Sequence, residues 1–443
     1  MSENKEYASK KVFKKAIFNV AFQIIPIAAA LILTPLLING MGKDFWAKYS
    51  TGISLIFLSN YFSFGIGPAL NRRVSEIIGL KKYNKITKEF QSCVSVSYLL
   101  GLIFFIFLEI GLFLAFQSNI FSILKTIEDY YFYTVVIFNF FLVFTIIPYR
   151  SLLESFSDFY FLAIIRAITA AMLFIAPFII INVTNELSLL SIAITLFVFY
   201  ILVYLVYFFR TKKYASNYSF RLLNPLGTEL IKSVLKFDLG FVKETFYFSL
   251  FFLASAIVLF FDRFYYPVFF NTVTLSDQVT LIDLFNRVAI ITGTLSLVYF
   301  SAISVWYQEK NFEKIRKNIK LQFIIVLGIF ALIILISYFF LLDILQWWLK
   351  DSYSTFISTN AFSLLLGAIS VNFTILLIRP LQAIGHIKQS SLWLLFSTFI
   401  YVVIVIILGL SNNINYHFIA LLVKALIDIC IFYFLMKKKG LIL

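Results

Sequence analysis

The sequence has few of the residues that build disulfide frameworks and metal sites. It contains only two cysteines and two histidines. Cys93 and Cys430 lie within or beside long apolar runs, so we expect buried thiols and no disulfide framework. His386 and His417 are predicted to be loop residues without neighbouring ligands, which gives no support for a metal site. No motif implies a cofactor.

Extended polar segments are also scarce. The longest stretch between apolar runs, residues 210–240, is too short to form a domain with its own core. The connections on the side with few bases carry few acids beyond Asp277, Asp343 and Asp351. A membrane-embedded glycosyltransferase or polymerase would need catalytic acids on a sizeable loop. We therefore expect a protein that is not an enzyme. A glycosyltransferase or polymerase is the least favoured of the alternative functions.

Long apolar runs fill almost all of the chain. Hydrophobic residues make up 61% of it and the mean hydropathy is +0.94, whereas about half of a soluble domain is apolar. A membrane-spanning helix needs roughly 20 apolar residues. The pattern predicts an all-α polytopic membrane protein with twelve transmembrane helices, at residues 15–39, 46–67, 92–116, 130–154, 159–182, 188–209, 241–268, 279–306, 321–342, 357–384, 390–410 and 415–436.

The placement of the 37 lysines and arginines predicts the topology. Most lie at the two termini and in alternate connections, while the opposite connections contain only Lys43, Lys48, Lys125 and Lys350. Positive residues stay cytoplasmic during insertion, so both termini are predicted to be cytoplasmic. The net charge of +15 therefore indicates contact with membrane lipids and no nucleic-acid partner.

The apolar runs divide into two sets of six. We predict an N-terminal six-helix lobe at 1–209, a cytoplasmic linker at 210–240 and a C-terminal six-helix lobe at 241–443. The halves are weakly alike, because Arg150 and Arg379 lie near the ends of the corresponding spans, 229 residues apart. A repeat of six spans gives both halves the same orientation, with the substrate path between them.

Several charges fall inside the predicted spans, where each costs at least ~2.5–3.5 kcal/mol. Spacing of i,i+4 lets two charges share a helix face, and three pairs have it: Arg150 with Glu154, Asp283 with Arg287, and Lys424 with Asp428. The first pair lies near the cytoplasmic boundary and is interpreted as structural. Arg287 and Lys424 are deeper, so they should face a watery cavity.

Arg166 and Arg263 have no acid three or four residues away. A guanidinium binds phosphate through forked hydrogen bonds, so such arginines suit an anion. We therefore predict a cationic cavity for a negatively charged substrate. Its predicted substrate-binding residues are Arg166, Arg263, Arg287 and Lys424, and the predicted coupling residues or charge partners are Glu109, Asp262, Asp283 and Asp428.

Two motifs carry a family resemblance. Residues 65–76, GIGPALNRRVSE, are similar to the segment after the second span of polysaccharide flippases in the multidrug/oligosaccharidyl-lipid/polysaccharide exporter superfamily. Asp262-Arg263 resembles an Asp-Arg pair that members often carry in the seventh span. The number of spans and the basic N-terminus extend the resemblance over the whole chain.

The resemblance implies a V-shaped pair of six-helix lobes that works by alternating access in the bacterial inner membrane. An undecaprenyl-diphosphate-linked oligosaccharide would enter from the inner leaflet and leave facing the periplasm, where a polysaccharide polymerase would be a partner. Family cavities are cationic, which agrees with the bases predicted from the residues.

Two transporter alternatives stay open. A cation-coupled multidrug exporter of the same superfamily would need acids for its cations, and the chain offers Glu109 and Asp262. A lipid II flippase would be expected to have two further C-terminal spans.

Overall fold

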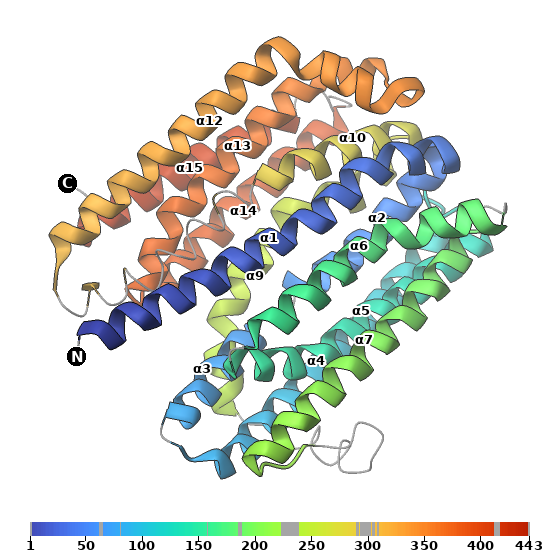
Figure 1. The fold of residues 1–443 in the computed structure, drawn as a ribbon. Coiled ribbons are helices and arrows are strands. Elements are labelled where there is room, and N and C mark those ends of the chain that lie inside the picture. Colours follow the sequence, from blue (N-terminus) through green and yellow to red (C-terminus); the bar gives the residue numbers. More distant parts are fainter. Residues whose placement is uncertain are drawn as a thin grey trace. The chain divides into compact units, whose positions relative to one another are not determined.

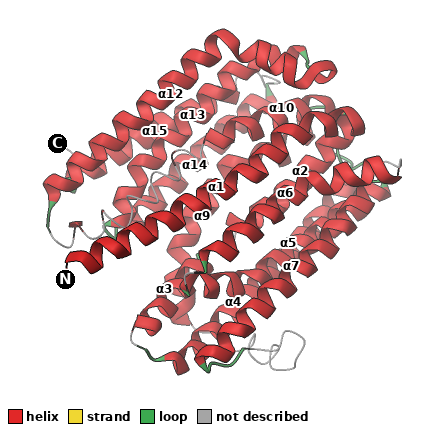
Figure 2. Cartoon of the chain, in the orientation of Figure 1, coloured by secondary structure: helices red, strands yellow, loops and turns green. Residues whose placement is uncertain are grey.

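The computed structural model describes residues 2–61, 65–79, 81–156, 158–184, 188–222, 239–288, 292, 303, 306–307, 310–411 and 417–441. Within these ranges the regular structure is helical, as Figure 2 shows. The predicted all-α class is confirmed. Ten of the described helices are long and apolar enough to cross a membrane. The predicted spans at 46–67 and 279–306 both include residues outside the described ranges.

The chain forms two compact units. Unit 1 comprises Met1–Met41 and Lys48–Ser249. Its helices are α1 (Ser2–Met41), most of α2 (Lys43–Tyr61), α3 (Ile66–Gly79), α4 (Ile86–Ser118), α5 (Ile127–Ser155), α6 (Phe159–Thr184), α7 (Leu189–Tyr218) and the start of α9 (Leu239–Phe269). In unit 1, α5 packs against α3, α4 and α7, and α1 packs against α6 (Figure 1). In the most apolar stretch of α5, 61% of the residues are buried, but only 11% are buried in the corresponding stretch of α4. Helix α5 is therefore central, and α4 faces lipid.

Unit 2 comprises Gly42–Ala47 and Leu250–Leu443. It contains the rest of α9, followed by α10 (Thr272–Phe285), α12 (Phe312–Leu349), α13 (Thr355–Ala383), α14 (Ile387–Leu410) and α15 (His417–Lys438). Here α13 is the central helix, and it contacts α10, α12, α14 and α15 (Figure 1).

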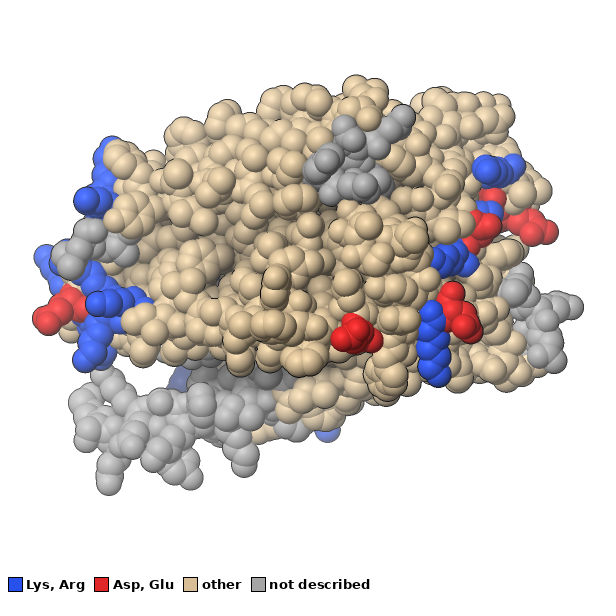
Figure 3. All heavy atoms as spheres, turned by 90° about the horizontal axis from the view of Figure 1, so that it is seen from above, with Lys and Arg blue, Asp and Glu red and all other residues tan. Residues whose placement is uncertain are grey.

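On the face drawn in Figure 3, most of the charged side chains lie towards its two ends, and the band between them holds few. Since burying a charge in hydrocarbon is costly, this distribution is typical of a protein with a lipid-facing belt.

The second predicted span differs from the structure. Residues 46–67 were expected to form one span, but α2 ends at Tyr61 and α3 begins at Ile66. Gly65 precedes α3 with φ of +65°, a conformation that glycine adopts without steric cost. The helical path is therefore interrupted at Gly65, and α3 packs against α4 and α5 as a separate helix.

Local capping begins α5 after the preceding turn. The Thr126 hydroxyl accepts a hydrogen bond from the backbone N–H of Asp129, and the Asp129 carboxylate accepts one from the N–H of Thr126 at 3.0 Å. This reciprocal capping box satisfies donors that the first helical turn leaves without partners. Lys48 of α2 adds an ion pair to Asp129 at 2.6 Å, which ties α2 to α5 within unit 1.

The predicted topology has a direct test in two surface cysteines. Ile120 and Ser216 are both exposed. Ile120 follows α4, and Ser216 lies in the last turn of α7. In a background without Cys93 and Cys430, Ile120→Cys should react with a membrane-impermeant maleimide in intact cells. Ser216→Cys should react only after permeabilisation, because a cytoplasmic N-terminus places the two positions on opposite sides. Labelling of both positions from one side would contradict the topology.

Candidate functional site

Unit 1 holds a cavity of about 220 Å³ bounded by α2, α5, α6 and α7. Two bases line it, Arg150 of α5 and Arg166 of α6, together with the hydroxyl-bearing Thr169, Tyr200 and Tyr207. The remaining wall is apolar and includes Ile56, Phe57 and Leu173. The cavity therefore presents two guanidinium groups in otherwise largely apolar surroundings.

The α5–α6 hairpin explains how these bases meet. Glu154 lies in the last turn of α5, and Arg166 lies seven residues into α6, which is roughly 10 Å along the helix. Side chains on a helix lean towards its N-terminus, so Arg166 points back towards the hairpin turn and Glu154 points away from it. The two side chains form an ion pair, and the Arg150 Nε lies 3.9 Å from the same Glu154 oxygen.

The sequence anticipated half of this cluster. The i,i+4 pairing of Arg150 with Glu154 is confirmed. The interpretation of Arg166 as a base without a local partner was incomplete, because its acid comes from the neighbouring helix. Helix spacing alone does not reveal such a contact, which depends on the length of the turn between α5 and α6.

The predicted pairing of Asp283 with Arg287 is wrong. Asp283 of α10 forms an ion pair with Arg263 of α9, whose side chain is only 1% exposed. The α-helix ends at Phe285 and continues as a 3₁₀ turn over Asn286–Val288. Three residues per turn shift Arg287 out of the i,i+4 position that an α-helix would give it. Among the described residues, Arg287 has no ion pair within 4.0 Å.

Lys424 and Asp428 form the predicted pair within α15. The Lys424 Nζ lies 2.5 Å from the Asp428 carboxylate, and the other carboxylate oxygen accepts a hydrogen bond from Ser397 of α14. The side chains of the pair are 2% and 0% exposed, so Lys424 is a fully buried base with its charge compensated.

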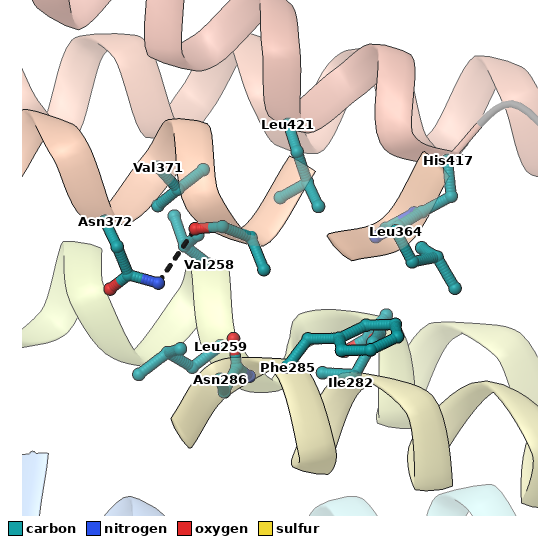
Figure 4. Close-up of a pocket in the computed structure, with 12 residues that line it drawn as sticks. Val258, Leu259, Ile282, Phe285, Asn286, Leu364, Val371, Asn372, His417 and Leu421 are labelled. Atoms are coloured by element: carbon teal, nitrogen blue, oxygen red, sulfur yellow. Dashed lines mark hydrogen bonds between the residues drawn. The ribbon is translucent and has the colours of Figure 1, made fainter. Parts of the chain in front are cut away.

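Asp262 is a buried acid in unit 2, within electrostatic reach of Arg263. It lines a small cavity of about 40 Å³ between α9, α10, α13 and α15, shown in Figure 4. It is 1% exposed, and neither carboxylate oxygen has a hydrogen-bond partner in the described part of the chain. The backbone amides of Asp262 and Arg263 approach the carboxylate without hydrogen-bond geometry. Burying an ionised carboxylate in this way is costly unless a proton or a cation neutralises it.

The same cavity contains polar groups that the sequence did not connect with Asp262. Asn286, Asn372 and His417 line it, and in Figure 4 they project from three different helical segments. His417 was expected in a loop, but it is the first residue of α15 and is 3% exposed. Nothing in the spacing of these residues indicates that tertiary packing gathers them.

Two tyrosines lie next to His417 but outside the lining of this cavity. The ring centroids of Tyr266 and Tyr401 lie 5.5 and 6.1 Å from that of the His417 imidazole. The Tyr401 hydroxyl is buried and, among the described residues, has no hydrogen-bond partner. No group of three potential metal ligands occurs in the described ranges. One carboxylate with imidazole, phenol and amide groups is suited to exchanging a proton or a monovalent cation.

Two further acids lie apart from these cavities. Glu109 of α4 has one oxygen 3.5 Å from the Thr134 hydroxyl, and its other oxygen is buried without a partner in the described part of the chain. Asp277 of α10 receives hydrogen bonds from Lys43 at 2.7 Å and from Ser354 at 2.5 Å. Burial raises the pKa of the Asp277 carboxyl, and these two hydrogen bonds counter that effect.

Comparisons with known proteins identify the fold. A family model described as MatE matches residues 20–159. No curated protein matches the chain. An inward-facing multidrug resistance MATE family transporter of the MOP superfamily aligns with a TM-score of 0.67 and 16% identity, covering 96% of this chain and 98% of that chain.

Two other solved structures have the same fold. The MATE multidrug transporter DinF-BH aligns with a TM-score of 0.64 and 15% identity, covering 97% of this chain and 95% of that chain. The lipid II flippase MurJ, in an inward closed conformation, aligns with a TM-score of 0.62 and 16% identity, covering 96% and 88%. The chain therefore has the fold that these solved MATE and MurJ structures share.

Proposed function

We propose that this protein is a flippase that moves an undecaprenyl-diphosphate-linked oligosaccharide across the bacterial inner membrane by alternating access. In this proposal, residues 1–209 and 241–443 act as two lobes joined on the cytoplasmic side by residues 210–240. A polysaccharide polymerase would consume the translocated unit on the opposite side.

The observation that carries the proposal is the pair of guanidinium groups lining one cavity of unit 1. Arg150 and Arg166 both face the carboxylate of Glu154, so among these three side chains two bases meet one acid. Guanidinium groups bind phosphoryl oxygens through paired hydrogen bonds, and the effect is stronger where water is partly excluded. The diphosphate of a lipid-linked sugar has the chemistry that this site would bind.

Energy for the cycle would enter at Asp262. A buried carboxylate without donors is a group whose protonation or cation binding can favour one conformation over another. This role supports the flippase and also the alternative, a cation-coupled multidrug exporter. Asp262 supports the exporter alternative, but that alternative does not explain why Arg150 and Arg166 line the cavity of unit 1. Uptake of a cationic dye by proteoliposomes, without any defect in surface polysaccharide on deletion, would favour the exporter.

The first test is a pair of alanine substitutions in the host. Arg150→Ala and Arg166→Ala are each expected to reduce surface polysaccharide about tenfold or more, because both bases line the cavity and a contact between a charged pair contributes roughly 2–5 kcal/mol. Lipid-linked glycan should accumulate on the inner leaflet, as it should when the gene is deleted. The amount of protein in the membrane is measured alongside.

Arg210→Ala is the matched control. Arg210 is paired with Asp158 at 2.7 Å and lies outside the cavity lining, so its loss removes one positive charge from unit 1 without removing a cavity base. Its polysaccharide output should be unchanged. Normal output from both Arg150→Ala and Arg166→Ala would remove the anion-binding argument for the proposed function.

A further inference from the structure

Glu154 differs from the other acids of unit 1 in having two bases on one oxygen. Arg166 forms an ion pair with Glu154 Oε1, and the Arg150 Nε lies 3.9 Å from the same atom. The three side chains are 22%, 18% and 33% exposed for Arg150, Glu154 and Arg166. A carboxylate thus holds two cations together inside the helical bundle.

The cavity is lined by the two arginines and not by Glu154. Both arginines belong to the lining of the 220 Å³ cavity, whereas Glu154 is absent from that lining among the described residues. An anion entering the cavity would therefore meet the guanidinium groups and compete with Glu154 for them. Tyr207, 3% exposed, lies within electrostatic reach of all three charges and lines the same cavity.

The depth of the cluster suits a phosphoryl group. Arg150 and Arg166 lie about 8 and 10 Å from the ends of their helices at the α5–α6 turn. The charge distribution predicts that this turn is cytoplasmic. At that depth the guanidinium groups are close to where lipid phosphates lie, so a lipid-linked phosphate could reach them without carrying its charge to the bilayer centre.

We propose that Glu154 is an internal counter-anion that a phosphoryl group of the substrate displaces from Arg166. This inference rests on the proposed function and adds a binding site and its regulation to it. When the site is empty, Glu154 compensates the two partly buried cations, which would otherwise repel each other. When substrate binds, its phosphoryl oxygens replace the carboxylate, and the return of Glu154 to Arg166 promotes release. Glu154 therefore lowers affinity and keeps the site from being trapped with substrate.

The direct test measures binding of inorganic pyrophosphate to the purified full-length protein by isothermal titration calorimetry. Glu154→Gln keeps the shape of the side chain and removes the competing charge. At a few ångströms two charges interact by several kcal/mol even when partly screened, so we expect the Kd of pyrophosphate to fall about tenfold or more. Adding Arg166→Ala to Glu154→Gln should abolish this gain.

Glu89→Gln is the matched control. Glu89 is paired with Arg73 at 2.9 Å in the same unit, and its side chain is 20% exposed, close to the 18% of Glu154. The net charge changes identically, so a general electrostatic effect would tighten pyrophosphate binding equally in both variants. That result would overturn the inference. Only Glu154→Gln is expected to bind more tightly.

A second variant guards against misfolding of Glu154→Gln. Glu154→Asp retains the charge but withdraws it by one methylene, so a smaller gain in pyrophosphate affinity is expected. If both folded variants bind no more tightly than wild type while wild type complements a deletion strain, the displacement is wrong and the flippase proposal stands. If wild type fails to restore surface polysaccharide, the proposed function itself fails.

Discussion

Replacing Lys424 alone with methionine is expected to destabilise the protein by about 3–5 kcal/mol, because the substitution leaves a buried carboxylate without its counter-charge. Asp428 is 0% exposed and accepts from Lys424 and Ser397 at 2.5 Å each. Loss of Lys424 removes the only cation paired with this carboxylate among the described residues. Unfolding by a denaturing detergent in mixed micelles, followed by tryptophan fluorescence, measures the change.

Removing both charges should restore stability. The double variant Lys424→Met/Asp428→Leu fills the space with apolar atoms and leaves no isolated charge, and such replacements are often neutral or stabilising. Lys437→Met, an exposed lysine of the same helix, serves as the control and should change stability by less than about 0.5 kcal/mol. A single Lys424→Met variant as stable as wild type would show that the pair is not compensated as the structure indicates.

The double variant also tests the role predicted for Lys424. If Lys424 binds substrate, a stable double variant should lose surface polysaccharide. If the output stays normal, the lysine serves the packing of α15 against α14, and the predicted substrate-binding set is reduced to the arginines.

The second large effect concerns Asp262. Asp262→Asn is expected to reduce polysaccharide output to the level of the deletion strain while raising the free energy of unfolding by roughly 1–3 kcal/mol. The reason is that the buried carboxylate has no hydrogen-bond donor among the described residues, so a neutral amide costs less to bury but cannot bind and release a proton or cation. Loss of function with a gain in stability is the expected signature of a functional residue kept at a cost to the fold.

Asp277→Asn gives the opposite signature and is the matched control. Asp277 is 4% exposed and is paired with Lys43 at 2.7 Å, so loss of its charge should lower stability. Output per folded molecule should stay normal, because Asp277 lines neither of the two cavities. If Asp262→Asn retains normal output, the coupling role is wrong, whatever its effect on stability.

The candidate sites were only partly predictable. Spacing within one helix correctly predicted Arg150 with Glu154 and Lys424 with Asp428, because i,i+4 neighbours meet wherever an α-helix forms. The same rule failed for Asp283 with Arg287, where the helix tightens into a 3₁₀ turn after Phe285. It also had no information about Arg166 or Arg263, whose acids lie on neighbouring helices.

The sequence by itself indicated that this protein lies in a membrane and that it is all-helical. It also predicted the side of the membrane on which each connection lies. The length of each apolar run and the basic residues beside it decide whether that segment spans the bilayer and in which direction. Both properties belong to the segment itself. Only the tertiary structure decided which charges are compensated, because an ion pair between helices depends on packing and on the length of each turn. That packing gives Arg166 and Arg263 acidic partners on neighbouring helices. It also buries Asp262, with His417 and Tyr401 nearby, without a hydrogen-bond partner in the described part of the chain.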